Sequence, residues 1–268
     1  MTISRQTLES LDQTARAAAD AARSAILPHF RQVGLAADSK SDEGFDPVTE
    51  ADRAAERAMR EILAQSRPDD AILGEEFGSS AGTSGLTWVL DPIDGTRGFV
   101  SGTPTWGVLI AVSDVSGPVY GLIDQPYIGE RFIGSALGAH ASGPLGVSEL
   151  STRDTQLLAD AVVFTTFPEV GSTEEGAAFR AVAKQARMTR YGMDCYAYAL
   201  LAAGQVDLVI EAGLQSYDIQ APLAVIEAAG GVVTDWHGGP AHEGGRALAA
   251  ANATIHAEAL AILKDSLG

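Results

Sequence analysis

The sequence has little of several features that mark common classes of protein. One cysteine, Cys195, occurs in 268 residues, which excludes an internal disulfide framework and a cysteine-based zinc site. Basic residues number 18 against 35 acidic ones, and the net charge of −17 opposes binding to a nucleic-acid polymer, which requires clustered lysine and arginine. No apolar run reaches the roughly 18 residues of a membrane span, and no charged segment followed by an apolar one opens the chain. We therefore expect a cytoplasmic protein that binds no membrane.

The hydrophobic share of 46% is enough to bury one large core or two fused ones. The surplus of acidic residues has a second meaning, because carboxylates are the ligands that hard divalent cations prefer. What matters is whether these carboxylates converge in space.

The N-terminal part predicts two helices separated by a loop. Apolar or small side chains recur at helical spacing over residues 7–30, and again over residues 51–65, where Pro47 suits the first turn. The polar, glycine-containing residues 34–45 predict a mobile loop or the tip of a hairpin.

Short apolar runs follow, and the first two deliver acids at their ends. Residues 71–73 precede Glu75 and Glu76, and residues 88–90 precede Asp91, which is typical of buried strands that end at an open face. Three further runs predict a meander of antiparallel strands. They cover residues 107–112, 119–123 and 131–133.

After about residue 150 the pattern alternates between strands and helices. Strands are predicted at residues 161–164, 206–210 and 232–234, and helices at residues 177–186, 195–203 and 218–229. We expect an α+β half over residues 1–150 with an antiparallel sheet and the metal site. An α/β half over residues 151–268 carries the substrate wall, and the two halves form one compact, layered catalytic unit.

The turn from Asp91 to Thr96 carries the strongest chemical signal. We expect the strand to end at Asp91, because Pro92 bars further ladder pairing, so that Asp94 arrives after a tight turn. Gly95 allows a ligand to approach the backbone, and Thr96 adds a hydroxyl beside amide donors that suit a phosphate. Other acids, Glu75 and Asp218, also stand where apolar runs meet loops or helices, and two neighbouring divalent ions require such a set of oxygen ligands.

The chain resembles the inositol monophosphatase-like phosphatases over nearly its whole length. The shared motifs are PVTEAD at 47–52, GEE at 74–76, WVLDPIDGT at 88–96, YD at 217–218 and EAAGG at 227–231. Within that family it is most similar to the histidinol-phosphate phosphatase branch. The corresponding stretches are DGTRGFVSG at 94–102, PTWG at 104–107, QP at 125–126, RYGMDCY at 190–196 and YDIQAP at 217–222.

The resemblance implies a five-layered αβαβα sandwich and a lithium-sensitive enzyme that forms a homodimer. It also implies two or three Mg²⁺ ions, for which Mn²⁺ can substitute. The implied metal ligands are Glu75, Asp91, the carbonyl of Ile93, Asp94 and Asp218.

The remaining roles are also implied by position in the family. Glu75 and Thr96 would orient the attacking water, with Thr49 and Asp52 in support, and the Gly95 and Thr96 amides would hold the phosphate. Substrate contacts would come from the C-terminal half and the turn. The residues concerned are Arg97, Gly192, Asp194 and Glu211.

We expect phosphate-monoester hydrolysis by direct attack of a metal-activated water, without a phosphoenzyme. Asp194 replaces a small, uncharged residue of the inositol enzymes, and a carboxylate suits an amine better than a polyol hydroxyl. That favours histidinol phosphate, and thus histidine biosynthesis, over inositol phosphate. Alternatively, Asp194 only caps the helix that begins near Cys195. Phe167 stands where the branch usually has a small polar residue, and the loop over residues 40–46 is longer than typical.

Several other functions remain open. On the same metals, the substrate could be inositol 1-monophosphate or a nucleotide 3′-phosphate. A glycoside hydrolase would use paired carboxylates without a metal, and a calcium-binding module without catalysis would need no Thr96 hydroxyl. The five histidines show no metal-ligand spacing, and Cys195 is expected to pack in a helix. Trp106 either walls the site or packs in the sheet.

Overall fold

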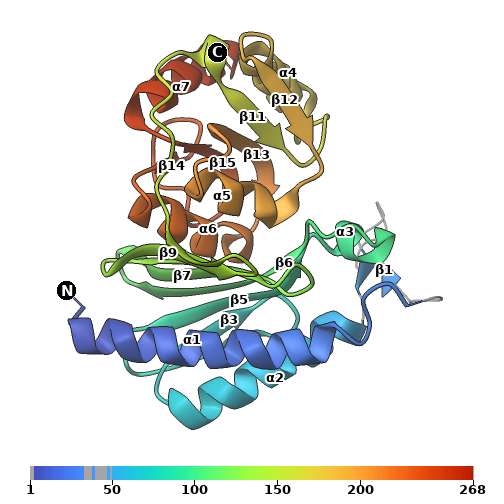
Figure 1. Cartoon of the computed structure of the whole chain (residues 1–268), viewed down its shortest axis with the longest axis vertical. Helices are drawn as coiled ribbons and strands as arrows, with labels where there is room; N and C mark the ends of the chain where they lie inside the picture. Colours follow the sequence, from blue (N-terminus) through green and yellow to red (C-terminus); the bar gives the residue numbers. More distant parts are fainter. Residues whose placement is uncertain (1–2, 33–37, 40–46, 49, 268) are drawn as a thin grey trace.

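The computed structural model describes residues 3–32, 38–39, 47–48 and 50–267. Figure 1 shows layers of helix and sheet stacked along the long axis of the molecule. The helices are α1 (Arg5–Ile26), α2 (Glu50–Ser66), α3 (Thr96–Ser101), α4 (Thr173–Ala183), α5 (Asp194–Ala202), α6 (Ser216–Ala228) and α7 (Ala253–Leu267), with one 3-10 turn, η1 (Leu158–Asp160).

The strands form three sheets. The smallest is a hairpin of β1 (Asp38–Ser39) and β2 (Pro47–Val48). The 8-stranded sheet has the order β10-β9-β8-β7-β6-β5-β3-β4, and the 5-stranded sheet has the order β12-β11-β13-β15-β14. Their bounds are β3 (Ala71–Gly74), β4 (Gly78–Ser80), β5 (Thr87–Asp94), β6 (Gly107–Asp114), β7 (Gly117–Gln125), β8 (Glu130–Ser135), β9 (Gly138–Gly143), β10 (Gly146–Glu149), β11 (Val162–Thr165), β12 (Met188–Tyr191), β13 (Leu208–Leu214), β14 (Val232–Thr234) and β15 (Gly245–Ala250).

Helices α1 and α2 lie side by side on the outer face of the 8-stranded sheet (Figure 1). Ala15, Ala18, Ala19 and Ala22 of α1 are all fully buried, and their small side chains allow the helix to approach its neighbours closely. Ser4 begins α1 by accepting a hydrogen bond from the amide of Thr7, which satisfies a donor that the first turn leaves free.

Helices α5 and α6 lie between the inner face of the 8-stranded sheet and the 5-stranded sheet (Figure 1). Helices α4 and α7 cover the opposite face of the 5-stranded sheet (Figure 1). The order of layers is therefore αβαβα, as the family resemblance implied. Helix α6 carries apolar side chains on all its faces, which fits its burial between two sheets. Among the described helices, none is both long and apolar enough to cross a membrane.

The predicted meander is confirmed, since β6, β7 and β8 pair in antiparallel succession. The expectation of a wholly antiparallel first sheet is wrong, because β3 and β5 are parallel neighbours. The second sheet is mixed, with β11 parallel to β12 and β13, and β15 antiparallel to β13 and β14. The alternating pattern predicted β11, β13 and β14 but missed two strands of this sheet, β12 and β15.

Two local expectations are also wrong. Pro47 belongs to β2 rather than to the first turn of a helix, which begins at Glu50. Strand β5 does not end at Asp91: it continues to Asp94, and its pairing with β6 is interrupted between these two residues. Pro92 has no N–H to donate, so the chain bulges and resumes the ladder at Asp94.

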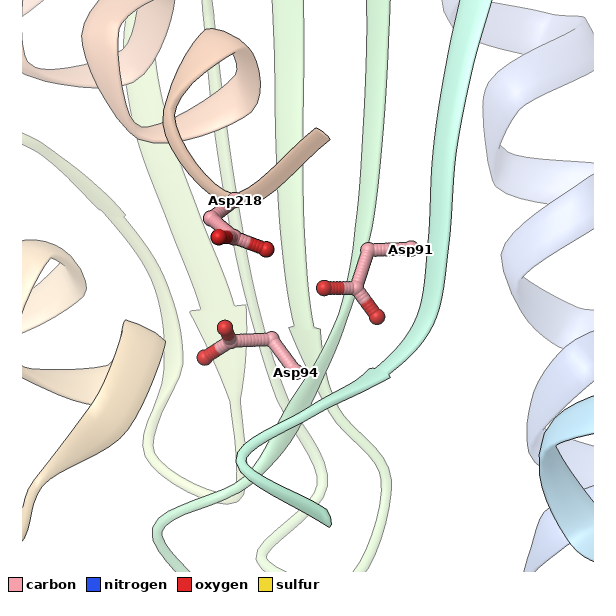
Figure 2. A group of neighbouring side chains, drawn as sticks. All are labelled: Asp91, Asp94 and Asp218. Carbon is pink, nitrogen blue, oxygen red and sulfur yellow. The ribbon is translucent and has the colours of Figure 1, made fainter. Parts of the chain in front are cut away.

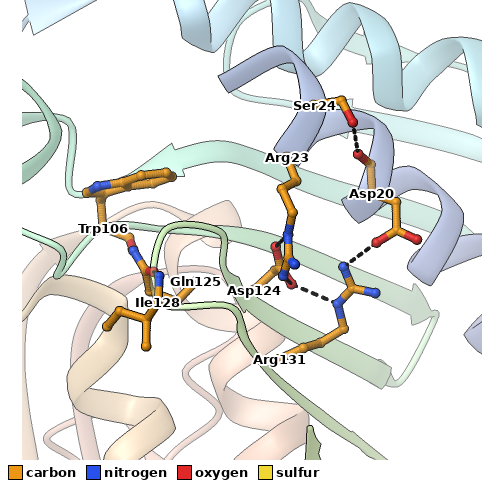
Figure 3. Close-up of polar contacts among 8 residues, drawn as sticks. All are labelled: Asp20, Arg23, Ser24, Trp106, Asp124, Gln125, Ile128 and Arg131. Atoms are coloured by element: carbon orange, nitrogen blue, oxygen red, sulfur yellow. Dashed lines mark hydrogen bonds and ion pairs between the residues drawn. The ribbon is translucent and has the colours of Figure 1, made fainter. Parts of the chain in front are cut away.

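A buried ion-pair network ties α1 to the 8-stranded sheet (Figure 3). The Asp124 carboxylate on β7 has no exposure and accepts bonds from Arg23 of α1 at 2.8 Å and from Arg131 of β8 at 2.7 Å. The next residue, Gln125, donates to the carbonyl of Trp106 and accepts from the amide of Ile128. This network fixes the start of β6 just beyond the Asp91–Thr96 turn.

Candidate active site

The turn at the end of β5 presents two acids and a left-handed glycine. Asp91 is buried on the bulged part of the strand, and Asp94 follows three residues later. Gly95 has φ 84°, a conformation that costs glycine little, and its carbonyl accepts the first intrahelical bond of α3 from Phe99. The Thr96 hydroxyl donates to the carbonyl of Ile93 at 3.2 Å, which closes the turn.

The parallel pairing of β3 and β5 brings a third acid to this place. Gly74 is the register partner of Leu90, and the Glu75 amide donates to the Leu90 carbonyl at 3.1 Å. Because parallel strands end at the same edge of a sheet, Glu75 emerges beside Asp91. The carboxylate of Glu56, fully buried on α2, accepts from the next amide, that of Glu76, at 2.7 Å.

The fourth acid comes from the other half of the chain. Asp218 lies in the first turn of α6, where its carboxylate accepts the Gln215 amide at 2.7 Å. Figure 2 shows the side chains of Asp91, Asp94 and Asp218 turned toward a common point. One carboxylate oxygen from each lies within 4.8 Å of the other two.

The electrostatics of this cluster are unfavourable for the protein alone. Burial, together with the charges of Glu75, Asp94 and Asp218, raises the pKa of Asp91 well above its usual range. Burial and the charge of Asp218 do the same to the pKa of Asp94, and burial raises that of Asp218 to about 6. Like charges this close disfavour the ionised state unless a cation neutralises them.

The donor set fits a hard divalent cation. Among the described residues, neither arginine nor lysine forms an ion pair with Asp91, Asp94 or Asp218, and one oxygen of Asp91 is buried without a hydrogen-bond partner there. Carboxylate oxygens facing one point without a protein cation are the ligands of Mg²⁺ and Ca²⁺. The described residues hold no other cluster of this kind, and the Asp91–Asp94–Asp218 cluster contains no histidine or cysteine.

A cavity of about 290 Å³ opens beside the cluster, lined by Asp94 to Arg97 on one side and by the C-terminal half on the other. Asp194 belongs to this wall. A Cβ added to Gly95 would lie 2.7 Å from its Cγ, so its side chain rests against the Asp91–Thr96 turn. It accepts a hydrogen bond from Thr105 at 3.0 Å.

The alternative that Asp194 only caps a helix is wrong. Asp194 is the first residue of α5, Met193 occupies the cap, and no side chain makes a capping bond there. The amide of Cys195 instead donates to Asp94 at 2.6 Å. Asp194 also holds φ 45°, and non-glycine residues in the left-handed region cluster at functional sites.

Glu211, in the middle of β13 where its pairing with β15 begins to shift register, completes the acidic wall. It accepts two bonds of 2.8 Å from Thr166, one from its amide and one from its hydroxyl. Burial nevertheless raises the pKa of Glu211 to about 7, and the charges of Asp194 and Asp218 act in the same direction.

The remaining predicted residues are distributed around these groups. Asp52 is buried on α2, within reach of the charge of Asp91, and Thr49 lies outside the described residues. Arg97 lies at the mouth of the cavity, where its guanidinium stands 4.9 Å from the ring centroid of Phe167. Gly192, with φ 77°, shapes the turn before α5 and is not among the residues that line the cavity.

Sequence reasoning missed two polar side chains that line the cavity, those of Tyr198 and Thr166. Tyr198 stands four residues after Asp194 on α5, a spacing that places both on one helix face and that could have revealed it. Trp106, by contrast, is fully buried against Phe30 and Phe99, and Cys195 is buried in the core as expected.

Comparison with known proteins agrees with this geometry. The pattern of the Inositol monophosphatase family matches residues 7–267. The Bifunctional phosphatase IMPL2, chloroplastic, of Arabidopsis thaliana is 43% identical over 233 residues, which cover 86% of this chain and 66% of the plant protein. The Histidinol-phosphatase of Streptomyces coelicolor is 37% identical over 263 residues, 92% of this chain and 94% of the relative.

Inositol phosphatases are found at similar distances. The Inositol-1-monophosphatase of Mycobacterium leprae is 35% identical over 216 residues, 77% of this chain and 74% of the relative. A solved inositol monophosphatase from Zymomonas mobilis superimposes with a TM-score of 0.85 at 38% identity, covering 98% of this chain and 100% of that one.

Proposed function

The chain belongs to the inositol monophosphatase family of metal-dependent phosphomonoester hydrolases, and on this basis we propose that it hydrolyses histidinol phosphate to histidinol and phosphate. The observation that carries this choice is the Asp194 carboxylate in the cavity wall, against the turn at Gly95. Relatives named histidinol-phosphatase, alignable over about nine-tenths of the chain, support it.

The proposed cation is Mg²⁺, two or three ions per site, with Mn²⁺ as a substitute. Its proposed ligands are the carboxylates of Glu75, Asp91, Asp94 and Asp218 and the carbonyl of Ile93. A bound divalent cation supplies Lewis acidity, which lowers the pKa of water and stabilises negative charge on phosphate and leaving oxygens.

The chain's own groups position the reactants. The amides of Gly95 and Thr96 hold phosphate oxygens at the start of α3, where the left-handed glycine leaves the backbone open to a ligand. Glu75 and the Thr96 hydroxyl orient the attacking water, and the Glu75 carboxylate accepts its proton. Thr49 and the buried Asp52 support them. Since phosphate monoesters react very slowly unaided, such positioning and charge stabilisation supply most of the acceleration.

The alcohol half of the substrate lies along the wall made by Asp194 and Glu211, with Arg97 at the mouth and Gly192 shaping the turn before α5. Once cations neutralise the Asp91–Asp94–Asp218 cluster, Asp194 and Glu211 leave this wall acidic. A carboxylate forms a charge-assisted hydrogen bond with an ammonium and only an ordinary one with a neutral hydroxyl. The wall therefore favours the amine of histidinol over a polyol.

Phosphate release tests the proposal directly. Histidinol phosphate, inositol 1-phosphate and adenosine 3′,5′-bisphosphate are each assayed with Mg²⁺ and with EDTA. We expect the highest kcat/KM for histidinol phosphate and no turnover in EDTA. Faster hydrolysis of inositol 1-phosphate would overturn the substrate in favour of the second candidate, which the inositol-1-monophosphatase relatives support. Turnover that survives EDTA would refute the role given to the carboxylate cluster.

Other properties belong to the same proposal. Lithium sensitivity and a homodimer rest on the family resemblance. A cytoplasmic location, a place in histidine biosynthesis, and action of residues 1–150 and 151–268 as one catalytic unit rest on the sequence pattern and the proposed substrate. Inhibition by LiCl and sedimentation of the purified chain test the first two.

A further inference from the structure

The hydroxyl of Tyr198 is a buried polar group without a partner. Its side chain projects from α5 into the wall of the cavity and is only 3% exposed. Among the described residues, no atom forms a hydrogen bond with this hydroxyl. A buried, unpaired hydroxyl is costly, so its retention points to a partner that arrives with the ligand.

The surroundings of this hydroxyl are acidic. After burial itself, the charges of Glu211, Asp94 and Asp218 are the causes that raise the pKa of Tyr198. Tyr198 follows Asp194 by four residues on α5, which places it about 6 Å further along the helix on the same face. Asp194 lies beside the phosphate-binding turn, and Tyr198 lies within range of the charge of Glu211.

We propose that Tyr198 is a specificity-determining residue, whose phenolic oxygen, together with Asp194 and Glu211, holds the ammonium group of a 2-amino-alcohol phosphate. This inference rests on the phosphatase site proposed above, but not on histidinol being the preferred alcohol. It applies to any monoester with an amine close to the ester carbon.

The numbers of donors and acceptors match. An ammonium group has three N–H donors and no acceptor, whereas a phenolic oxygen accepts one bond and still donates its own proton. Thr166 engages one oxygen of Glu211, and Thr105 engages one oxygen of Asp194. The two carboxylates and the phenol therefore offer three acceptors to one ammonium. A neutral hydroxyl could use only part of this set.

Three small esters of matched size test the inference: 2-aminoethyl phosphate, 2-hydroxyethyl phosphate and propyl phosphate. The quantity measured is the ratio of kcat/KM for the amino ester to that for the propyl ester, with Mg²⁺ present. We expect Tyr198→Phe to lower this ratio about tenfold, the effect of one hydrogen bond to a charged group, and mainly through KM. The control is Tyr196→Phe, which removes a phenol on the same helix that bonds to Glu130 outside the cavity.

Unfolding by urea gives a readout that does not depend on turnover. Loss of the unpaired hydroxyl in Tyr198→Phe leaves the midpoint unchanged or raises it, whereas Tyr196→Phe lowers it because a hydrogen bond is lost. A lower midpoint for Tyr198→Phe would show that the hydroxyl is already paired in the free protein, and would overturn the inference.

The activity outcomes separate this inference from the proposed function. A ratio within twofold of wild type in Tyr198→Phe refutes the role of Tyr198, and a larger loss for the hydroxyethyl ester refutes the assignment to an ammonium. If wild type prefers inositol 1-phosphate to histidinol phosphate and Tyr198→Phe still lowers the ratio, only the substrate proposed above fails.

Discussion

Replacement of Glu56 by alanine should damage both the stability of the protein and its affinity for divalent cations. The Glu56 carboxylate is fully buried on α2. It accepts the Glu76 amide at 2.7 Å, the Phe77 amide at 3.3 Å and the Arg60 guanidinium at 2.7 Å. These bonds hold the turn after β3, from which Glu75 projects toward Asp91.

The loss of stability in Glu56→Ala follows from the groups that the substitution leaves without a hydrogen-bond partner. An unpaired amide costs about 1–3 kcal/mol when it is buried, and the long bond to Phe77, a residue with 45% exposure, belongs at the low end. Arg60 is 20% exposed and keeps its bond to the Gly78 carbonyl. Loss of its ion pair with Glu56 therefore adds about 1 kcal/mol at most. The sum is about 2–5 kcal/mol, which overlaps the range of about 3–5 kcal/mol for breaking a buried ion pair. It is a large part of the 5–15 kcal/mol by which domains are usually stable.

The assay is urea unfolding followed by circular dichroism, in EDTA and again in Mg²⁺. Glu61→Ala is the control, because Glu61 is exposed on the same helix and surface changes of this kind stay within about 0.5 kcal/mol. Calorimetric titration with Mg²⁺ measures the second effect: Glu56→Ala should bind the cation more weakly, and Glu61→Ala normally.

A second substitution makes the test stricter. A Cβ on Gly74 would collide with the Glu56 carboxylate, so Gly74→Ala should be much less harmful in the Glu56→Ala background than in wild type. If Glu56→Ala is as stable as Glu61→Ala, or if the Gly74→Ala effect is the same in both backgrounds, the reasoning about this turn is wrong.

Three further predictions concern the acids of the site. Asp94→Asn should lose cation binding and about 10³ or more in kcat, since a cation supplies several kcal/mol. It should be no less stable in EDTA, because a repelling charge is gone; a calorimetric titration and urea unfolding decide, and normal Mg²⁺ binding would contradict the role as ligand. Asp194→Ala should raise KM for an amine-bearing substrate about tenfold with little change in kcat, and an unchanged KM in steady-state assays would argue against contact with substrate. The raised pKa of Glu211, about 7 against 4.5 for the unperturbed group, means that the folded chain retains a proton that the unfolded chain releases. The contribution of Glu211 to the free energy of unfolding therefore falls by about 3 kcal/mol as pH rises from 4.5 to about 7. In urea unfolding at pH 4.5 and pH 7.5, without cation, Glu211→Gln should show a smaller fall than wild type.

Local patterns in the sequence determined much of the fold and one part of the site. Helical spacing of small apolar residues predicted α1 and α2, and short apolar runs with acids at their ends predicted β3 and β5. The turn from Asp91 to Thr96 was predicted as well, because proline and glycine act on the backbone within a few residues. Its detailed form was not: the strand continues as a bulge to Asp94, since the ladder with β6 resumes on the far side of Pro92.

Only the tertiary structure decided which acids meet. The apolar residues that follow Asp218 indicate a buried helix, but nothing near Asp218 in the chain specifies that its first turn faces Asp91 and Asp94. Likewise, the parallel pairing that sets Glu75 beside Asp91, the left-handed backbone of Asp194 and the unpaired hydroxyl of Tyr198 arise from how distant elements pack. Periodicity and turn chemistry act over a few residues, whereas convergence of a site depends on burying the faces of whole helices and sheets together.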